Sequence, residues 1–149
     1  ERKILQAKQQ TPFVAVMGCS DSRVPSEIIF DQGLGDIFVV RTAGQVMADA
    51  SVGSLEFATA VLGVKAIVVL GHEKCGAVKG AIGKDPLPGK IEYLVNQIRP
   101  AIQPYIGDES KLEEAAHKNV EYQVKKIKEL NPILKKYIDE GKIKVVGAM

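Results

Sequence analysis

The chain has 149 residues, of which 46% are hydrophobic and 26% are charged. This composition is typical of a globular domain and excludes a disordered chain. The net charge of +2 is too small to indicate a nucleic acid partner, and no apolar run approaches the ~18 residues of a membrane span. The small net charge favours a small-molecule partner. The chain opens without the charged and then apolar pattern of a signal peptide, so we expect a cytoplasmic protein.

Four short, continuously apolar runs predict strands, at residues 12–16, 36–40, 65–70 and 142–146. Between the first two runs, residues 26–31 predict a short helix. Between the second and third runs, residues 49–63 predict a longer helix with Asp49 or Ser51 as its N-cap. Strands that alternate with helices favour an α/β fold with a mostly parallel sheet and flanking helices on both faces.

The C-terminal third of the chain predicts a helical subregion. A Pro/Gly-rich loop precedes three helical patterns, at residues 91–102, 108–130 and 131–140. Asp108 and Asn131 are suitable caps, and Pro132 suits a first helical turn. The last strand would then return to the sheet edge, and we expect a single domain over residues 1–149.

Two of the predicted strands end in residues that bind metals. Cys19 follows the first strand, and "GHEKCG" after the third supplies His72 and Cys75. Because the carboxyl ends of parallel strands lie along one edge of a sheet, these three side chains can converge. Two thiolates and one imidazole suit Zn²⁺, and three protein ligands leave a fourth position free, as in catalytic zinc sites. The sequence therefore predicts a catalytic zinc.

The stretch "CSDSR" adds a carboxylate and a guanidinium beside the first ligand. Asp21 can accept a hydrogen bond from a zinc-bound water or bind the metal itself, and Arg23 can hold Asp21 in either role. Neighbouring cations favour the ionised form of Asp21, so we expect an acceptor rather than a general acid. Because zinc lowers the pKa of bound water to about 7, the expected chemistry is attack of a hydroxide on a small electrophile.

Simpler interpretations exist for each residue alone, because buried cysteines are often small core hydrophobes. A metalloprotease motif is excluded by Gly76, and a dinucleotide fingerprint is excluded by Phe38. A metal-free enzyme with Cys19 as a thiol nucleophile stays possible, but it leaves Cys75 unexplained. The second histidine, His117, falls in a charged helical pattern and is expected to face solvent.

The segments "CSDSRVP", "GDIFVVRTAG", "SLEFATAVLGV" and "VVLGHEKCGAVKGAI" occur in this order within about residues 10–83. Together they closely resemble the β-class carbonic anhydrases. The resemblance implies a β-carbonic-anhydrase-like fold, zinc bound by Cys19, His72 and Cys75, and a catalytic pair of Asp21 and Arg23. The implied activity is reversible hydration of CO2 to bicarbonate and a proton by zinc hydroxide. In that family the aspartate can also close the site as a fourth ligand.

The resemblance further implies five substrate-binding residues, which are Gln10, Phe38, Ala43, Phe57 and Gly76. Gln10 would reach across from a partner subunit, so we expect a homodimer or a higher even-numbered homo-oligomer. The two phenylalanines and the alanine would line an apolar pocket, and Gly76 would offer its backbone N–H. From the pattern alone, core packing explains the two phenylalanines equally well.

The chain departs from the family at several positions. Phe57 stands where many relatives have tyrosine and the chain has no tryptophan, so we expect no inhibitory bicarbonate site. Only a short amphipathic stretch, residues 1–9, precedes the resemblance, and the chain stops at Met149 inside what resembles the final strand. We therefore expect a chain trimmed at both ends relative to the family. A carbon disulfide or carbonyl sulfide hydrolase would carry the same ligands. A non-catalytic zinc-binding module would have Asp21 permanently in the fourth position.

Overall fold

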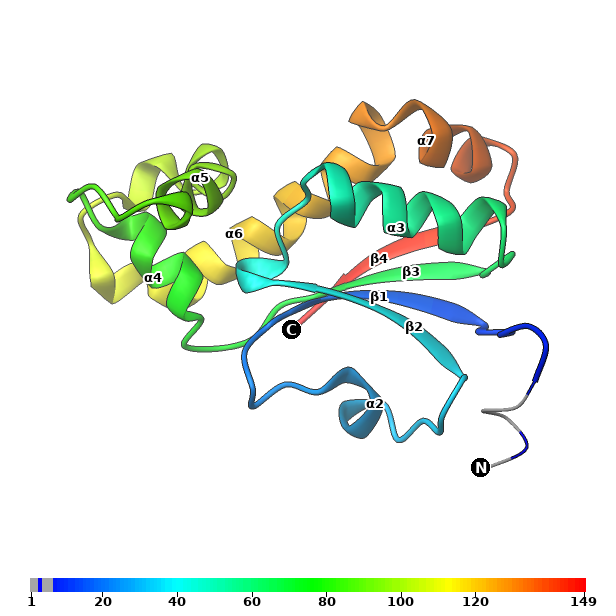
Figure 1. Cartoon of the computed structure of the whole chain (residues 1–149). Coiled ribbons are helices and arrows are strands. Elements are labelled where there is room, and N and C mark those ends of the chain that lie inside the picture. The colour runs from blue at the N-terminus through cyan, green and yellow to red at the C-terminus, as the bar shows by residue number, and fades with distance from the viewer. Residues whose placement is uncertain (1–2, 4–6) are drawn as a thin grey trace.

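The computed structural model describes residue 3 and residues 7–149, so most of the amphipathic stretch at residues 1–9 lies outside the described residues. Within this part of the chain, four strands form one parallel sheet in the order β2-β1-β3-β4. The strands are β1 (Val14–Cys19), β2 (Ile37–Thr42), β3 (Ala66–Leu70) and β4 (Lys144–Ala148). The predicted parallel sheet and the edge position of the last strand are confirmed (Figure 1).

The predicted helices occur in the expected order along the chain, and α4 (Gly76–Ile82), which directly follows Cys75, was not predicted. The others are α2 (Ser26–Ile29), α3 (Asp49–Ala60), α5 (Lys90–Asn96), α6 (Leu112–Lys125) and α7 (Pro132–Asp139). Shorter turns lie between them: the 3₁₀ turns η1 (Ala43–Gln45), η2 (Arg99–Ala101), η3 (Gln103–Tyr105) and η4 (Glu109–Lys111), and the π-helical turn η5 (Lys126–Leu130). The helix predicted at 91–102 is interrupted because Pro100 has no N–H to donate, and the chain continues there as the turn η2.

Two of the predicted caps are confirmed and one is wrong. Asp108 accepts a hydrogen bond from the Ser110 N–H, and Asn131 accepts one from the Leu134 N–H at 2.7 Å. At α3, however, Ala48 occupies the N-cap position, because the helix begins at Asp49. Ser51 then lies in the first turn, where its hydroxyl reaches back to accept the Ala48 N–H at 2.8 Å.

Helical cover is concentrated on one face of the sheet, where α3, α6 and α7 lie (Figure 1). The main core forms there, from inward side chains such as Met17, Ile67 and Val69, which are fully buried. On the opposite face lies the short helix α2, and Val146 of β4 stays half exposed. The expectation of strands covered on both faces is therefore wrong for this edge of the sheet.

A second core lies beyond the carboxyl ends of the strands, where α4, α5 and α6 pack together (Figure 1). It includes Val78, Ile82 and Ile98, and also both cysteines. This helical subregion therefore covers the edge of the sheet at which β1 and β3 end. None of the helices among the described residues is long and apolar enough to cross a membrane.

Candidate metal centre

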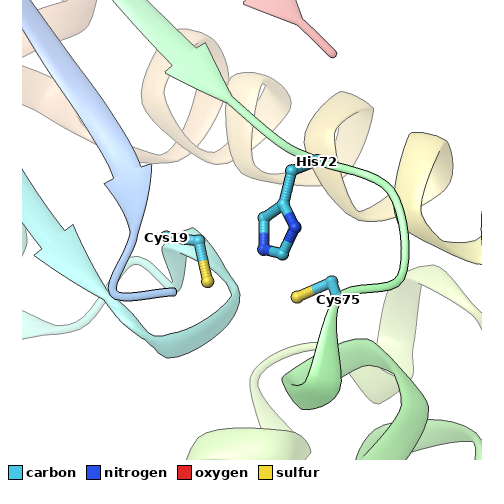
Figure 2. Close-up of side chains that lie close together, drawn as sticks. All are labelled: Cys19, His72 and Cys75. Atoms are coloured by element: carbon cyan, nitrogen blue, oxygen red, sulfur yellow. The ribbon is translucent and has the colours of Figure 1, made fainter. Parts of the chain in front are cut away.

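The carboxyl ends of β1 and β3 bring three potential ligands together (Figure 2). Cys19 is the last residue of β1, and His72 and Cys75 lie in the loop that joins β3 to α4. Since β1 and β3 are adjacent parallel strands, their ends lie side by side. The ligand atoms of the three residues all lie within 4.8 Å of one another, and all three side chains are buried. The strand order reverses at β1, which is where ligands bind in open parallel sheets.

The donor set fits zinc. His72 places its Nδ1 at 2.8 Å from the Glu73 carbonyl oxygen, a contact that suits an Nδ1–H donor. Its other ring nitrogen, Nε2, is buried and makes no hydrogen bond to the described residues. A buried nitrogen lone pair beside two free thiols is costly without a cation to bind it. Two sulfurs and one imidazole nitrogen are ligands that zinc prefers.

The surroundings of Cys19 favour its thiolate, which is the form that binds metal. A hydrogen bond with the Cys75 thiol is the largest influence that lowers the pKa of Cys19, and backbone N–H groups of Gly44 and Asp21 add to it. These N–H groups lie 3.2 and 3.4 Å from the Cys19 sulfur. The same thiol contact raises the pKa of Cys75. Because a metal binds cysteine sulfur as the thiolate, metal binding would release any proton that the two sulfurs hold.

Asp21 and Arg23 form a close ion pair beside this cluster. Arg23 donates from Nε to Asp21 Oδ1 at 2.9 Å and from Nη2 to Oδ2 at 2.7 Å, and its backbone N–H also binds Oδ1 at 3.0 Å. These bonds hold the pKa of the Asp21 carboxyl well below its ordinary value. Asp21 Oδ2 lies 3.9 Å from His72 Nε2, so the carboxylate faces the cluster while Arg23 holds it.

Arg41 at the end of β2 was missed as a contributor to this site. Its Nε donates to the Cys19 carbonyl oxygen at 2.7 Å and its Nη2 to the Asp21 carbonyl oxygen at 2.6 Å. It therefore holds the backbone that carries the potential ligand Cys19 and the Asp21 carboxylate. The available signal was a single arginine near the end of an otherwise apolar strand.

The five predicted substrate-binding residues divide into two groups. Gly76 begins α4 directly after Cys75, and Ala43 begins η1 next to Gly44, so both lie beside the cluster. Gln10, by contrast, lies before β1, at the opposite end of the sheet.

The second histidine, His117, was expected to face solvent, and its side chain is exposed.

Phe38 and Phe57 pack against each other, with ring centroids 6.3 Å apart. Phe38 pairs in register with Ala15, four residues before Cys19, which places it ~13 Å along the sheet from the cluster at 3.3 Å per residue. Phe57 remains 45% exposed on α3. Within one chain, neither phenylalanine lies beside the three ligands.

The fold and the site define a metal-binding protein of the α/β class, with its ligands at the switch point of a parallel sheet. Comparison with known proteins agrees in detail. A family model described as carbonic anhydrase matches residues 14–149. A crystal structure of one of two tetrameric β-carbonic anhydrases from the filamentous ascomycete Sordaria macrospora is similar with a TM-score of 0.86 and 27% sequence identity. That match covers 98% of this chain and 78% of that one.

Curated relatives show higher sequence identity over a shorter span. A carbonic anhydrase of Mycolicibacterium smegmatis is 50% identical over 106 residues, which cover 68% of this chain and 52% of that protein. Carbonic anhydrase 2 of Mycobacterium tuberculosis is 52% identical over 100 residues, or 64% of this chain and 48% of that protein. The chain thus spans about half the length of these curated relatives. It belongs to the carbonic anhydrase family, with the fold of the β class.

Proposed function

We propose that this chain is a zinc-dependent lyase that reversibly hydrates CO2 to bicarbonate and a proton. The observation that carries the proposal is the buried cluster of Cys19, His72 and Cys75 with the Arg23-bound carboxylate of Asp21 beside it. When bound, zinc supplies a Lewis acid that lowers the pKa of water from 15.7 to about 7, which provides a nucleophile at neutral pH.

Asp21 acts in this proposal as a fixed hydrogen-bond acceptor. Its pKa lies well below the ordinary value because of the bonds from Arg23, so at neutral pH it accepts a hydrogen bond and does not donate one. It therefore orients the nucleophilic water at Oδ2, the oxygen that lies 3.9 Å from His72 Nε2. Because Arg23 binds both carboxylate oxygens, Asp21 would be held back from a bound zinc, and a fourth position on that zinc would be left to a small molecule. This arrangement favours an enzyme over a zinc module that Asp21 closes.

The active unit in the proposal is a homodimer. Gln10, Phe38 and Phe57 all lie away from the three ligands of their own chain. Two of them are accessible to a neighbour, since Gln10 is exposed and Phe57 is half exposed. A partner subunit would complete the apolar pocket with these residues. The cytoplasmic localisation and the absence of an inhibitory bicarbonate site stay predictions from the sequence.

The test is a side-by-side assay of CO2 hydration and CS2 hydrolysis. The purified chain is measured with its zinc, after removal of zinc by a chelator, and after zinc is returned. We expect CO2 hydration that is lost with the metal and restored with it, and no turnover of CS2. Turnover of CS2 alone would show that CS2 and not CO2 is the substrate. Full activity without metal would refute the proposal.

A further inference from the structure

Helix α6 carries two side-chain amides that are fully buried, Asn119 and Gln123. They lie four residues apart on one face, and Gln123 Nε2 donates to Asn119 Oδ1 at 3.0 Å. Buried amides are destabilising unless their hydrogen bonds are satisfied. Beyond the pair, Asn119 Nδ2 donates to the Gly44 carbonyl oxygen at 2.9 Å, and the Met47 N–H donates to Gln123 Oε1 at 3.1 Å. The amide pair therefore binds the backbone of residues 43–47, and Gln123 Nε2 makes one longer contact elsewhere, 3.5 Å from the Gln97 carbonyl oxygen.

The segment at residues 43–47 has a backbone that needs such support. Gly44 has a φ of 71° and Gln45 a φ of 44°, both in the left-handed region. For Gln45, which has a Cβ, this conformation is strained and persists only where the surroundings hold it. The fit is also tight, because a Cβ at Gly44 would lie 2.7 Å from the Ile98 side chain.

This conformation has a direct consequence at the metal site. It points the Gly44 N–H at the Cys19 sulfur, 3.2 Å away. A hydrogen bond from an N–H group to a thiolate stabilises the charged sulfur, and partners of this kind tune how strongly a ligand holds its metal. The Asn119 carboxamide binds the carbonyl of the same glycine. A continuous set of hydrogen bonds thus joins the middle of α6 to a metal ligand.

We propose that Asn119 and Gln123 are positioning residues for zinc, which act through residues 43–47 to aim the Gly44 N–H at the Cys19 sulfur. Apolar side chains of similar size would fill the same space but would leave the Gly44 carbonyl and the Met47 N–H without these partners. The inference concerns how zinc is held and not what is hydrated. Its failure would leave the proposal on CO2 untouched.

The experiment compares Asn119→Leu and Gln123→Met with the unmodified zinc protein. Zinc affinity is measured by competition with a chromophoric chelator, and the thiolate-to-cobalt charge-transfer absorption is recorded after replacement of zinc by Co²⁺. We expect the zinc affinity to fall by about 10–100-fold. We also expect the absorption to move to lower energy, because a sulfur that loses an N–H partner is richer in electrons.

The matched control is Ile127→Val. Ile127 is fully buried in η5, which continues α6, and it packs in the main core. Its aliphatic side chain cannot hydrogen-bond to the backbone of residues 43–47, so the variant changes packing alone. The control should lose thermal stability and keep both zinc affinity and cobalt absorption. Unchanged affinity and absorption in the folded amide variants would overturn the proposal, as would an equal loss in the control. Should Asn119→Leu fail to fold, Gln123→Asn, which shortens the amide by one methylene, is judged by the same two outcomes.

Discussion

The expected role of Asp21 as a hydrogen-bond acceptor depends on Arg23, which binds both of its carboxylate oxygens. Hydrogen bonds from Arg23 lower the pKa of Asp21, so the carboxylate stays charged throughout the neutral range. A group with a lowered pKa stabilises the folded state above its unfolded pKa of ~3.9, and this contribution is lost as the pH falls through the lower folded value. Between pH 6 and 9, neither the charge of Asp21 nor its ion pair with Arg23 should change.

Asp21→Asn keeps the size of the side chain and removes its charge. We expect zinc to stay bound and CO2 hydration to slow by about 10²-fold, the lower end of the range for a positioned proton-handling group. Because Asp21 does not titrate between pH 6 and 9, the loss should be present throughout that range. Stopped-flow hydration rates across the range, with metal content measured on the same samples, test this. A loss confined to one end of the range would contradict it.

At the scale of the elements, the side chain of Asn131 stabilises the start of α7. Asn131 Oδ1 accepts the Leu134 N–H at 2.7 Å, and Asn131 Nδ2 donates to Glu56 Oε1 of α3 at 2.8 Å. One residue therefore both caps α7 and joins it to α3 on the same face of the sheet. The cap was visible in the sequence, whereas the contact with α3 was not.

Asn131→Ala should destabilise the fold without touching the metal site. Loss of the N-cap and of the bond to Glu56 predicts a decrease of about 1–2 kcal/mol in the free energy of unfolding. Urea unfolding measures it, and CO2 hydration should be unchanged. Asn131→Ser keeps an N-cap oxygen but cannot donate to Glu56 in the same way, so its loss should be smaller. An equal loss in both variants would show that the cap is not the main contribution.

At the scale of the whole molecule, the metal site joins segments that are far apart in the chain. Cys19 is the last residue of β1, whereas Cys75 directly precedes α4. A ligand that binds only the folded state stabilises it by about 4 kcal/mol at a thousand times its dissociation constant. Zinc removal should therefore lower the melting temperature measured by calorimetry, and zinc addition should restore it. A melting temperature unaffected by chelation would contradict a stabilising role for the metal.

The proposed dimer makes a prediction that activity alone can test. Asp21→Asn damages a site in its own chain, whereas Gln10→Ala would damage the site of the partner. Mixed dimers would then contain one site with both residues intact. Statistical mixing of the two variants should restore about a quarter of the unmodified sites.

The matched control mixes Asp21→Asn with Arg23→Ala, because both residues belong to the same half of the site. No restoration is expected there. If the first mixture gains no activity over its separate components while subunits exchange, Gln10 does not act across a dimer interface.

Local patterns were enough to predict the strands, the helices other than α4, and two of the caps. They work because periodicity and residue chemistry act over a few positions, as in the apolar run that becomes β1 and the Asn131 cap. The zinc ligands could also be named, since the ends of parallel strands meet at one edge and few residue types bind zinc. The weak cover over β4 could not be foreseen, because an apolar strand has the same pattern whether or not a helix covers it.

Sequence patterns were sufficient for the four strands, for the helices other than α4, and for the atoms that can bind a metal. Tertiary structure alone decided that Phe38 and Phe57 pack away from the ligands of their own chain, and that Gln45 adopts a left-handed backbone. It also decided that Asn119 and Gln123 reach a segment 75 and 76 positions away. The physical reason is that such contacts arise from the packing of whole elements, and no pattern over neighbouring residues encodes which buried amide will face which carbonyl.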